Sequence, residues 1–138
     1  MAESRGTWKG GMRFEIEQDG HSFVLDASED FGGSDAGPRP KGLLLSGLIG
    51  CTGMDVVSIL RKMRVENYEL RIECRAGLTD GYPSVFDRIR LDYIFKGREL
   101  PVENIEKAVR LSQEKYCGVS AMLRLAAPLE WRILYERV

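Results

Sequence analysis

The sequence has few of the residues from which catalytic and metal sites are usually built. It contains one histidine, His21, and its three cysteines include no C-x-x-C pair. A structural zinc site draws four Cys or His ligands at close spacing. The four such residues here are scattered, so we expect no metal and no bound cofactor. A cysteine hydrolase would need a histidine beside its thiol, and His21 follows a turn glycine where exposure is expected.

The sequence also has no excess of charge and no apolar targeting segment. Its 20 Lys+Arg and 21 Asp+Glu give a formal net charge of −1, which argues against nucleic acid or an anionic membrane surface as a partner. Residues 1–11 lack the apolar stretch of a secretory signal. No uninterrupted apolar run reaches the roughly 20 residues of a membrane span. We therefore expect a cytoplasmic protein, in which an odd number of cysteines argues against a framework of structural disulfides and leaves reactive thiols as an open alternative.

Alternating polar and apolar residues predict β-structure at both ends and in the middle of the chain. The Asp19-Gly20 pair is a strong hairpin signal between the first two predicted strands. Gly81 and Pro83 mark a second turn, so the strands beside it are expected to pair antiparallel. The predicted strands are 13–18, 23–26, 69–76, 85–96 and 129–135.

The remaining segments predict a long helix over 40–64 and two later helices over 102–116 and 119–126. Between Gly42 and Leu60 the only charged residue is Asp55. A helix that is apolar nearly all round is expected to be buried on all sides. Because 138 residues would struggle to enclose it, burial by a second subunit is the simplest solution. The order of elements predicts one α+β domain over residues 1–138.

Two cysteine segments resemble motifs of the OsmC/Ohr family. Cys51 lies in GLIGCTGMDVVSILRKMR and Cys117 in LSQEKYCGVSAML. The loop GGSDAGPRP and the order of elements also fit, so the resemblance covers about residues 7–137 and is closest to an OsmC-like subgroup. It implies an OsmC-like fold, with antiparallel sheets wrapped around a long central helix. It also implies an intertwined homodimer with active sites at the subunit interface.

The chemistry implied by the resemblance is thiol-dependent reduction of organic hydroperoxides. Cys51 corresponds to the peroxidatic cysteine and Cys117 to the resolving cysteine, joined after reaction by an intramolecular disulfide. The implied reductant is an external dithiol, often of the lipoyl type. Cys74 takes an inward position on an alternating strand, where a free cysteine acts as a small apolar residue.

The chain departs from the Ohr-type pattern in the residues that activate the thiolate. In that pattern an arginine stabilises the thiolate and a glutamate holds the arginine, but Gly42 stands in the place of the glutamate. Arg13 is the nearest candidate for the arginine, and an ordinary solvated charge is an equally good interpretation of it. Arg39 is a weaker candidate, and Lys41 is a further source of positive potential.

Several interpretations remain open beside the peroxidase one. Asp55 lies one turn after Cys51 on the same side of the helix. It is interpreted as a proton relay or as a structural acceptor for backbone or Ser/Thr donors across the dimer, with the latter favoured. Two interpretations are open for a further group of side chains, which either line a peroxide pocket or belong to the core. These residues are Tyr116, Met122, Leu123 and Leu125. The alternative function is a non-catalytic dimer that binds small apolar molecules or has a structural role.

Overall fold

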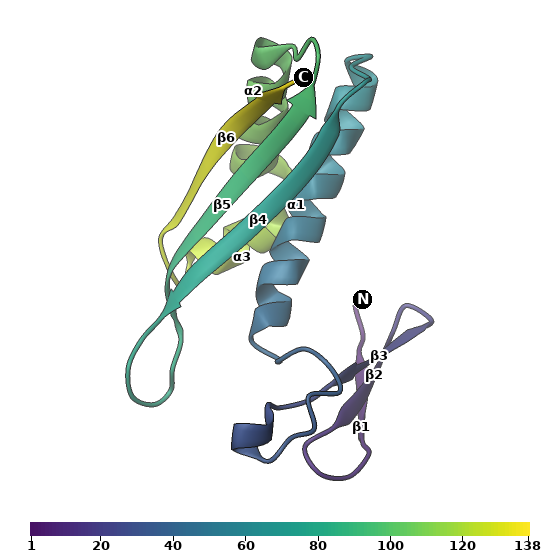
Figure 1. Ribbon diagram of the computed structural model, residues 1–138, viewed down its shortest axis with the longest axis vertical. Helices are drawn as coiled ribbons and strands as arrows, with labels where there is room; N and C mark the ends of the chain where they lie inside the picture. Colours follow the sequence, from purple (N-terminus) through teal and green to yellow (C-terminus); the bar gives the residue numbers. More distant parts are fainter. The chain divides into compact units, whose positions relative to one another are not determined.

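The first compact unit, Met1–Leu44, contains a three-stranded antiparallel sheet. The structure, a computed structural model, describes residues 1–138 and divides into this unit and Leu45–Val138 (Figure 1). The sheet has the order β1-β2-β3, with bounds Arg5–Trp8, Phe14–Gln18 and His21–Leu25. Asp19 and Gly20 both have positive φ, 51° and 77°, as the predicted tight hairpin turn requires. Strand β1 was not predicted, because its sequence RGTW lacks alternation.

The loop that follows β3 is organised around the carboxylate of Asp26, which is buried. Its oxygens accept backbone N–H bonds from Ala27 at 2.8 Å and from Ser34 and Ala36, both at 3.0 Å. These bonds, with that from Ala36 strongest, lower the pKa of Asp26, and Arg13 adds a smaller effect in the same direction. The short 3-10 helix η1, Glu29–Phe31, lies within this loop. A buried carboxylate therefore orders backbone that has no sheet partner.

Two glycines of this loop let the backbone approach itself closely. A Cβ added at Gly33 would lie 2.0 Å from the oxygen of Ala27, and one added at Gly37 would lie 2.0 Å from the oxygen of Val24. No side chain fits at that distance. The GGSDAGPRP segment of the sequence thus has a local structural explanation.

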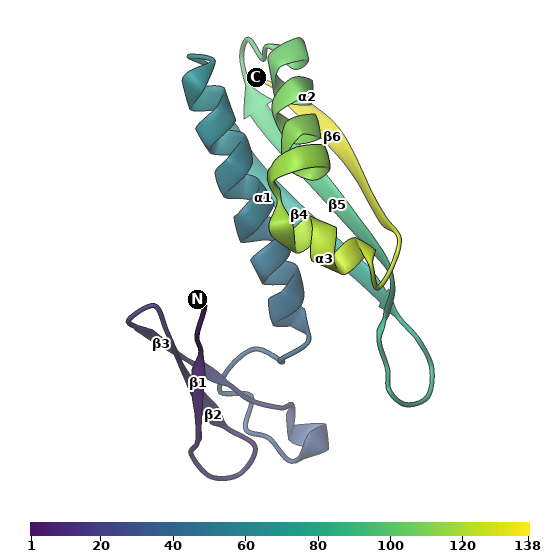
Figure 2. The ribbon, with the colours of Figure 1, turned by 180° about the vertical axis from the view of Figure 1, so that it is seen from behind.

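The second unit is built on the sheet β4-β5-β6, with helices on one face (Figures 1 and 2). Strands β4, Glu69–Leu78, and β5, Phe86–Gly97, pair antiparallel as predicted. Strand β6, Leu129–Arg137, joins β5 in parallel, so this sheet is mixed. The pairing is parallel because the intervening helices return the chain to the end where β5 began.

Three α-helices and one π-helical turn complete this part of the chain. Helix α1 spans Gly42–Lys62, α2 spans Val102–Leu111 and α3 spans Gly118–Arg124. The helix predicted over 102–116 is α-helical only to Leu111, and continues as the π-helical turn η2, Ser112–Tyr116. The sequence pattern indicated a helix there but could not distinguish a change in backbone hydrogen bonding.

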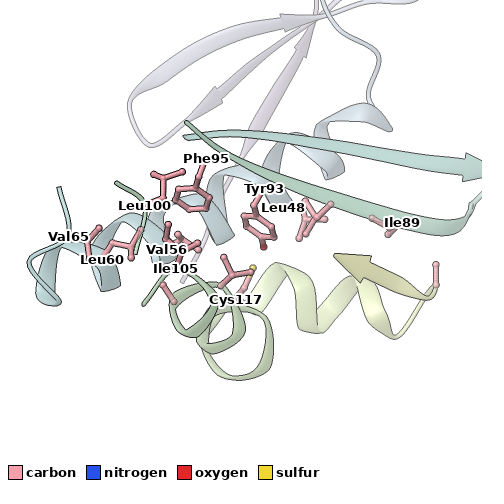
Figure 3. Packing of buried hydrophobic residues seen from close by; sticks show 14 residues of the cluster. Leu48, Val56, Leu60, Val65, Ile89, Tyr93, Phe95, Leu100, Ile105 and Cys117 are labelled. Carbon is pink, nitrogen blue, oxygen red and sulfur yellow. The ribbon is translucent and has the colours of Figure 1, made fainter. Parts of the chain in front are cut away.

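The core of the second unit lies between the helices and the inner face of the sheet (Figure 3). One face of α1, the inner face of β5 and one face of α2 supply most of its fully buried side chains. They recur with the spacing of an amphipathic helix or a half-buried strand. These residues are Leu48, Thr52, Val56, Leu60, Ile89, Leu91, Tyr93, Phe95, Ile105, Ala108 and Val109.

The opposite face of α1 is exposed in the single chain. Met54 is 76% exposed and Val57 37%, and a Cβ added at Gly47 or Gly50 would meet nothing within 4 Å. The expectation that this helix is buried on all sides is therefore not met within one chain. Helix α1 is long and apolar enough to cross a membrane, although core helices of soluble proteins meet the same criterion.

Candidate active site

The fold brings Cys51 and Cys117 together within the second unit. Cys51 lies in the middle of α1, and Cys117 is the N-cap residue directly before α3. Their sulfur atoms and a carboxylate oxygen of Asp55 all lie within 4.8 Å of one another. Cys117 is buried in the core cluster (Figure 3), whereas Cys51 and Asp55 are half-buried. The two cysteines chosen from the sequence are thus neighbours, and Asp55 faces them as expected.

The π-helical turn η2 places Cys117 in this position. The N–H of Cys117 donates to the oxygen of Ser112 at 2.7 Å, which closes the wide turn. Cys117 then adopts extended backbone, with φ −76° and ψ 101°, and its sulfur accepts a bond from the N–H of Ser120 at 3.3 Å. Wide π-type turns are frequent at functional sites. Here the turn aims a thiol from the start of α3 toward the middle of α1.

The environments of Cys117 and Cys74 both favour the neutral thiol. Burial raises the pKa of Cys117, and the neighbouring Cys51 raises it further. Burial alone raises the pKa of Cys74 to about 11. Cys74 is half-buried against the core cluster, which confirms its expected role as a small apolar residue.

This raised pKa predicts that Cys74 alkylates slowly at neutral pH. The thiolate is the reactive form, and with a pKa of about 11 roughly one Cys74 in a thousand is ionised at about pH 8. We expect its rate with iodoacetamide to rise about tenfold per pH unit over about pH 7–10. Peptide mass spectrometry after timed alkylation measures this rate. Unfolding in urea should remove the suppression, and equal rates in folded and unfolded protein would contradict the prediction.

Behind the thiols lies a buried chain of hydroxyl groups that ends on Asp55. Ser112 Oγ donates to Asp55 Oδ2 at 2.9 Å and contacts Thr52 Oγ1 at 2.7 Å. Thr52 Oγ1 also lies 2.7 Å from the hydroxyl of Tyr93, which accepts from Gln113 Nε2 at 2.8 Å. Since each hydroxyl has one proton, the chain has one consistent direction. Gln113 donates to Tyr93, Tyr93 to Thr52, Thr52 to Ser112, and Ser112 to the carboxylate.

Arg124 fixes the far end of this chain. Its guanidinium donates to the backbone oxygen and to Oε1 of Gln113, both at 2.7 Å. Because Oε1 faces Arg124, the amide Nε2 of Gln113 must face Tyr93. Burial raises the pKa of Tyr93 to about 12, so this residue stays a neutral donor. The hydrogen-bonded chain of hydroxyl groups therefore runs from the guanidinium of Arg124 to the carboxylate of Asp55, with every donor directed toward Asp55.

The sequence alone did not predict the hydroxyl groups in the middle of this hydrogen-bonded chain. A threonine on the apolar α1 and an inward tyrosine on β5 were the available signals, because buried hydroxyls need partners. Asp55 accepts from Ser112 of its own chain, so it is a structural acceptor as favoured, but the donor does not come from across the dimer as expected. Arg124 was not considered.

The other predicted site residues have different surroundings. Arg13 precedes β2 in the first unit and acts electrostatically on Asp26. Arg39 is 2.8 Å from Asp35 in an ion pair and donates to the oxygen of Gly37. Neither is placed relative to Cys51, so their part in thiolate activation stays a prediction. His21 is exposed, as expected.

The four residues proposed for a peroxide pocket do not form a core within the chain. Tyr116 is 52% exposed, Met122 64% and Leu125 91%, and Leu123 is half-buried. The interpretation as ordinary core therefore holds for Leu123, which packs against the core cluster. It is wrong within the single chain for Tyr116, Met122 and Leu125. These side chains are left available to a ligand or to another subunit.

The chain is similar to known proteins both in its sequence and in its fold. A family model described as OsmC-like protein matches residues 32–132. Protein YhfA of Escherichia coli (strain K12) is 34% identical over 125 residues, 90% of each chain. The crystal structure of a protein from Aquifex aeolicus VF5 matches with a TM-score of 0.82 at 25% identity, over 99% of this chain and 98% of that one.

The same fold occurs in an organic hydroperoxide resistance protein OsmC from Legionella pneumophila. Its crystal structure matches with a TM-score of 0.69 at 14% identity, over 97% of this chain and 96% of that one. At this identity the likeness concerns the α+β fold alone. The family model and the YhfA relationship together establish that the chain belongs to the OsmC-like protein family.

Proposed function

We propose that the protein reduces organic hydroperoxides with Cys51 and Cys117 as a redox pair. The observation that supports this most directly is the proximity of the two sulfur atoms, which lie within 4.8 Å of each other although they belong to distant segments. A disulfide joins sulfur atoms about 2.05 Å apart, so sulfur atoms that already lie this close need little movement to form one. The Legionella relative of this fold is named an organic hydroperoxide resistance protein.

The proposed reaction begins with attack of the Cys51 thiolate on the O–O bond. An S–O bond forms, the O–O bond breaks, and the leaving alkoxide takes up a proton to become an alcohol. Cys117 then attacks the Cys51 sulfenic acid, which forms the disulfide and releases water. An external dithiol, of the lipoyl type or similar, restores both thiols by two exchange steps. A cytoplasmic location, where thiols are kept reduced, suits this cycle.

A peroxide assay with a dithiol present tests the proposal. We expect tert-butyl hydroperoxide to be consumed faster than hydrogen peroxide, because apolar side chains such as Met122 and Leu125 are exposed on α3 and after it. Non-reducing mass spectrometry should then find a Cys51–Cys117 disulfide. The absence of turnover with either peroxide would contradict the proposal.

One observation favours the second candidate, a non-catalytic dimer that binds small apolar molecules. Asp55, held by Ser112, places a carboxylate beside Cys51, where the Ohr-type pattern has an arginine. The chain also lacks the family glutamate at Gly42. The presence of both cysteines, with sulfur atoms within 4.8 Å of each other, is the reason for ranking peroxide reduction first.

We propose further that residues 1–138 act as one domain within an intertwined homodimer. The first unit has few buried side chains of its own: Trp8 is 63% exposed, Met12 51% and Phe14 45%. Forty or so residues rarely fold stably without such a core. The exposed face of α1 is equally apolar. A second copy of the protein that covers the first unit and the outer face of α1 would explain why these apolar side chains are exposed in one chain. Arg13 would then be available to a thiol of either chain.

A charge on the outer face of α1 should break this dimer. Met54→Glu places a carboxylate where we expect apolar contact, at a cost of several kcal/mol if it is buried unpaired. Sedimentation at low micromolar concentration should show dissociation or unfolding. Tyr82→Glu, in the exposed β4–β5 loop, is the matched control and should remain dimeric. A folded wild-type monomer at that concentration would overturn the dimer proposal.

Restoring the family glutamate should increase the activity. A Cβ at Gly42 would meet nothing within 4 Å, so Gly42→Glu is expected to fold normally. The new carboxylate would orient an arginine beside Cys51, and we expect a higher second-order rate constant with peroxide. An unchanged rate in an intact dimer would count against activation of the Ohr type.

A further inference from the structure

We propose that Cys51, Asp55 and Cys117 form a binding site for a thiophilic divalent cation, with Zn²⁺ as the expected ion. The three side chains offer two sulfur atoms and one carboxylate oxygen, all within 4.8 Å of one another. Zinc in proteins is bound by thiolates at about 2.3 Å and by carboxylates at about 2.0–2.2 Å. Tetrahedral ligation at these lengths places the ligand atoms about 3.5–4 Å apart, which small side-chain rotations would achieve.

The position of the ligands in the fold supports a preformed site. Cys51 and Asp55 are one helical turn apart on α1, so their side chains lie on the same face. Cys117 approaches from the start of α3, and its backbone is fixed by the π-helical turn. Three protein ligands leave a fourth coordination position for water or a small molecule, as in zinc sites that are not purely structural.

The hydroxyl chain behind Asp55 supports the geometry of the site, because it holds this carboxylate beside the two sulfur atoms. Every donor in it is directed toward this carboxylate, through Ser112 at 2.9 Å. Hydrogen bonds to a ligating carboxylate fix its orientation and strengthen metal binding. Asp55 is a poor activator of the adjacent thiols but a suitable ligand beside them. A bound cation would balance the negative charge of the two thiolates and the carboxylate.

Metal binding and disulfide formation would exclude each other. Ligation converts both thiols to thiolates with release of their protons, without change of oxidation state. Both sulfur atoms are then occupied, so neither is free to attack a peroxide or a sulfenic acid. The site requires only the observed geometry, and it does not depend on whether the protein is a peroxidase.

Cobalt substitution tests the site directly. Co²⁺ added to the fully reduced protein without oxygen should produce a sulfur-to-cobalt charge-transfer band and tetrahedral d–d bands, saturating at one ion per site. Zn²⁺ should displace it and abolish the bands, whereas Mg²⁺ should not, because sulfur ligands select thiophilic ions. A reduced protein with no charge-transfer band at excess Co²⁺ would overturn the proposal.

Single substitutions assign the ligands. Cys51→Ser and Cys117→Ser should each weaken Co²⁺ binding at least a hundredfold and reduce the charge-transfer intensity. Asp55→Asn should weaken binding about tenfold or more with the sulfur bands retained. Cys74→Ser is the matched control, and it should bind as the wild type does. Loss of binding in Cys74→Ser, or wild-type binding when Cys51 and Cys117 are both serine, would refute the assignment.

A protection experiment on the unmodified chain avoids any effect of substitution on folding. Zn²⁺ should slow alkylation of Cys51 and Cys117 at least tenfold and leave the rate of Cys74 unchanged. Equal rates with and without Zn²⁺ would contradict the site. If Zn²⁺ slows alkylation of Cys51 and Cys117 but the protein consumes no peroxide, the proposed function is refuted and the metal site is still supported.

Discussion

Replacing Cys51 by serine is expected to abolish peroxide consumption, with a loss of at least about 1000-fold. The serine hydroxyl is not ionised at neutral pH and cannot attack the O–O bond. Cys51 is half-buried on α1, so the smaller side chain should leave the fold intact. Stopped-flow consumption of tert-butyl hydroperoxide, with a dithiol in excess, measures the effect.

The other two cysteines provide the controls. Cys117→Ser should react once, accumulate a sulfenic acid on Cys51 that dimedone traps, and then fail to form the intramolecular disulfide. Cys74→Ser should retain the wild-type rate, because its high pKa keeps it in the unreactive thiol form. A major disulfide that includes Cys74 would overturn the assignment of the redox pair.

Thr52→Val should lower the free energy of unfolding by about 1–3 kcal/mol although the two side chains have nearly the same shape. Thr52 is fully buried, and its hydroxyl connects Tyr93 to Ser112. Valine leaves the Tyr93 proton without its acceptor and Ser112 without its donor. Urea unfolding at matched protein concentration gives the value, since subunit association would also contribute.

Thr7→Val is the matched control for this substitution. Thr7 lies on the exposed strand β1, so the same chemical change should alter stability by less than about 0.5 kcal/mol. An equal effect at both positions would show that loss of hydroxyl bonding is not the cause. Wild-type stability of Thr52→Val would show that the hydroxyl chain contributes nothing.

Local interactions explain what could be predicted from the sequence. The Asp19-Gly20 turn, the alternation in β4 and β5 and the apolar run of α1 depend on residues close together in the chain, and each was confirmed. Cys51 and Cys117 were selected as a pair through motifs around each cysteine. The family assignment made from these motifs was also confirmed.

Tertiary packing decided the rest, because it depends on residues that are far apart in the sequence. The parallel pairing of β6 with β5 follows from how α2 and α3 return the chain. The hydroxyl chain joins α1, β5 and η2, so no single segment contains its pattern. The sequence by itself predicted most of the elements and singled out Cys51 and Cys117. Only the tertiary structure placed Asp55 and both sulfur atoms within 4.8 Å of one another, since that distance is fixed by helix and strand packing and not by local spacing.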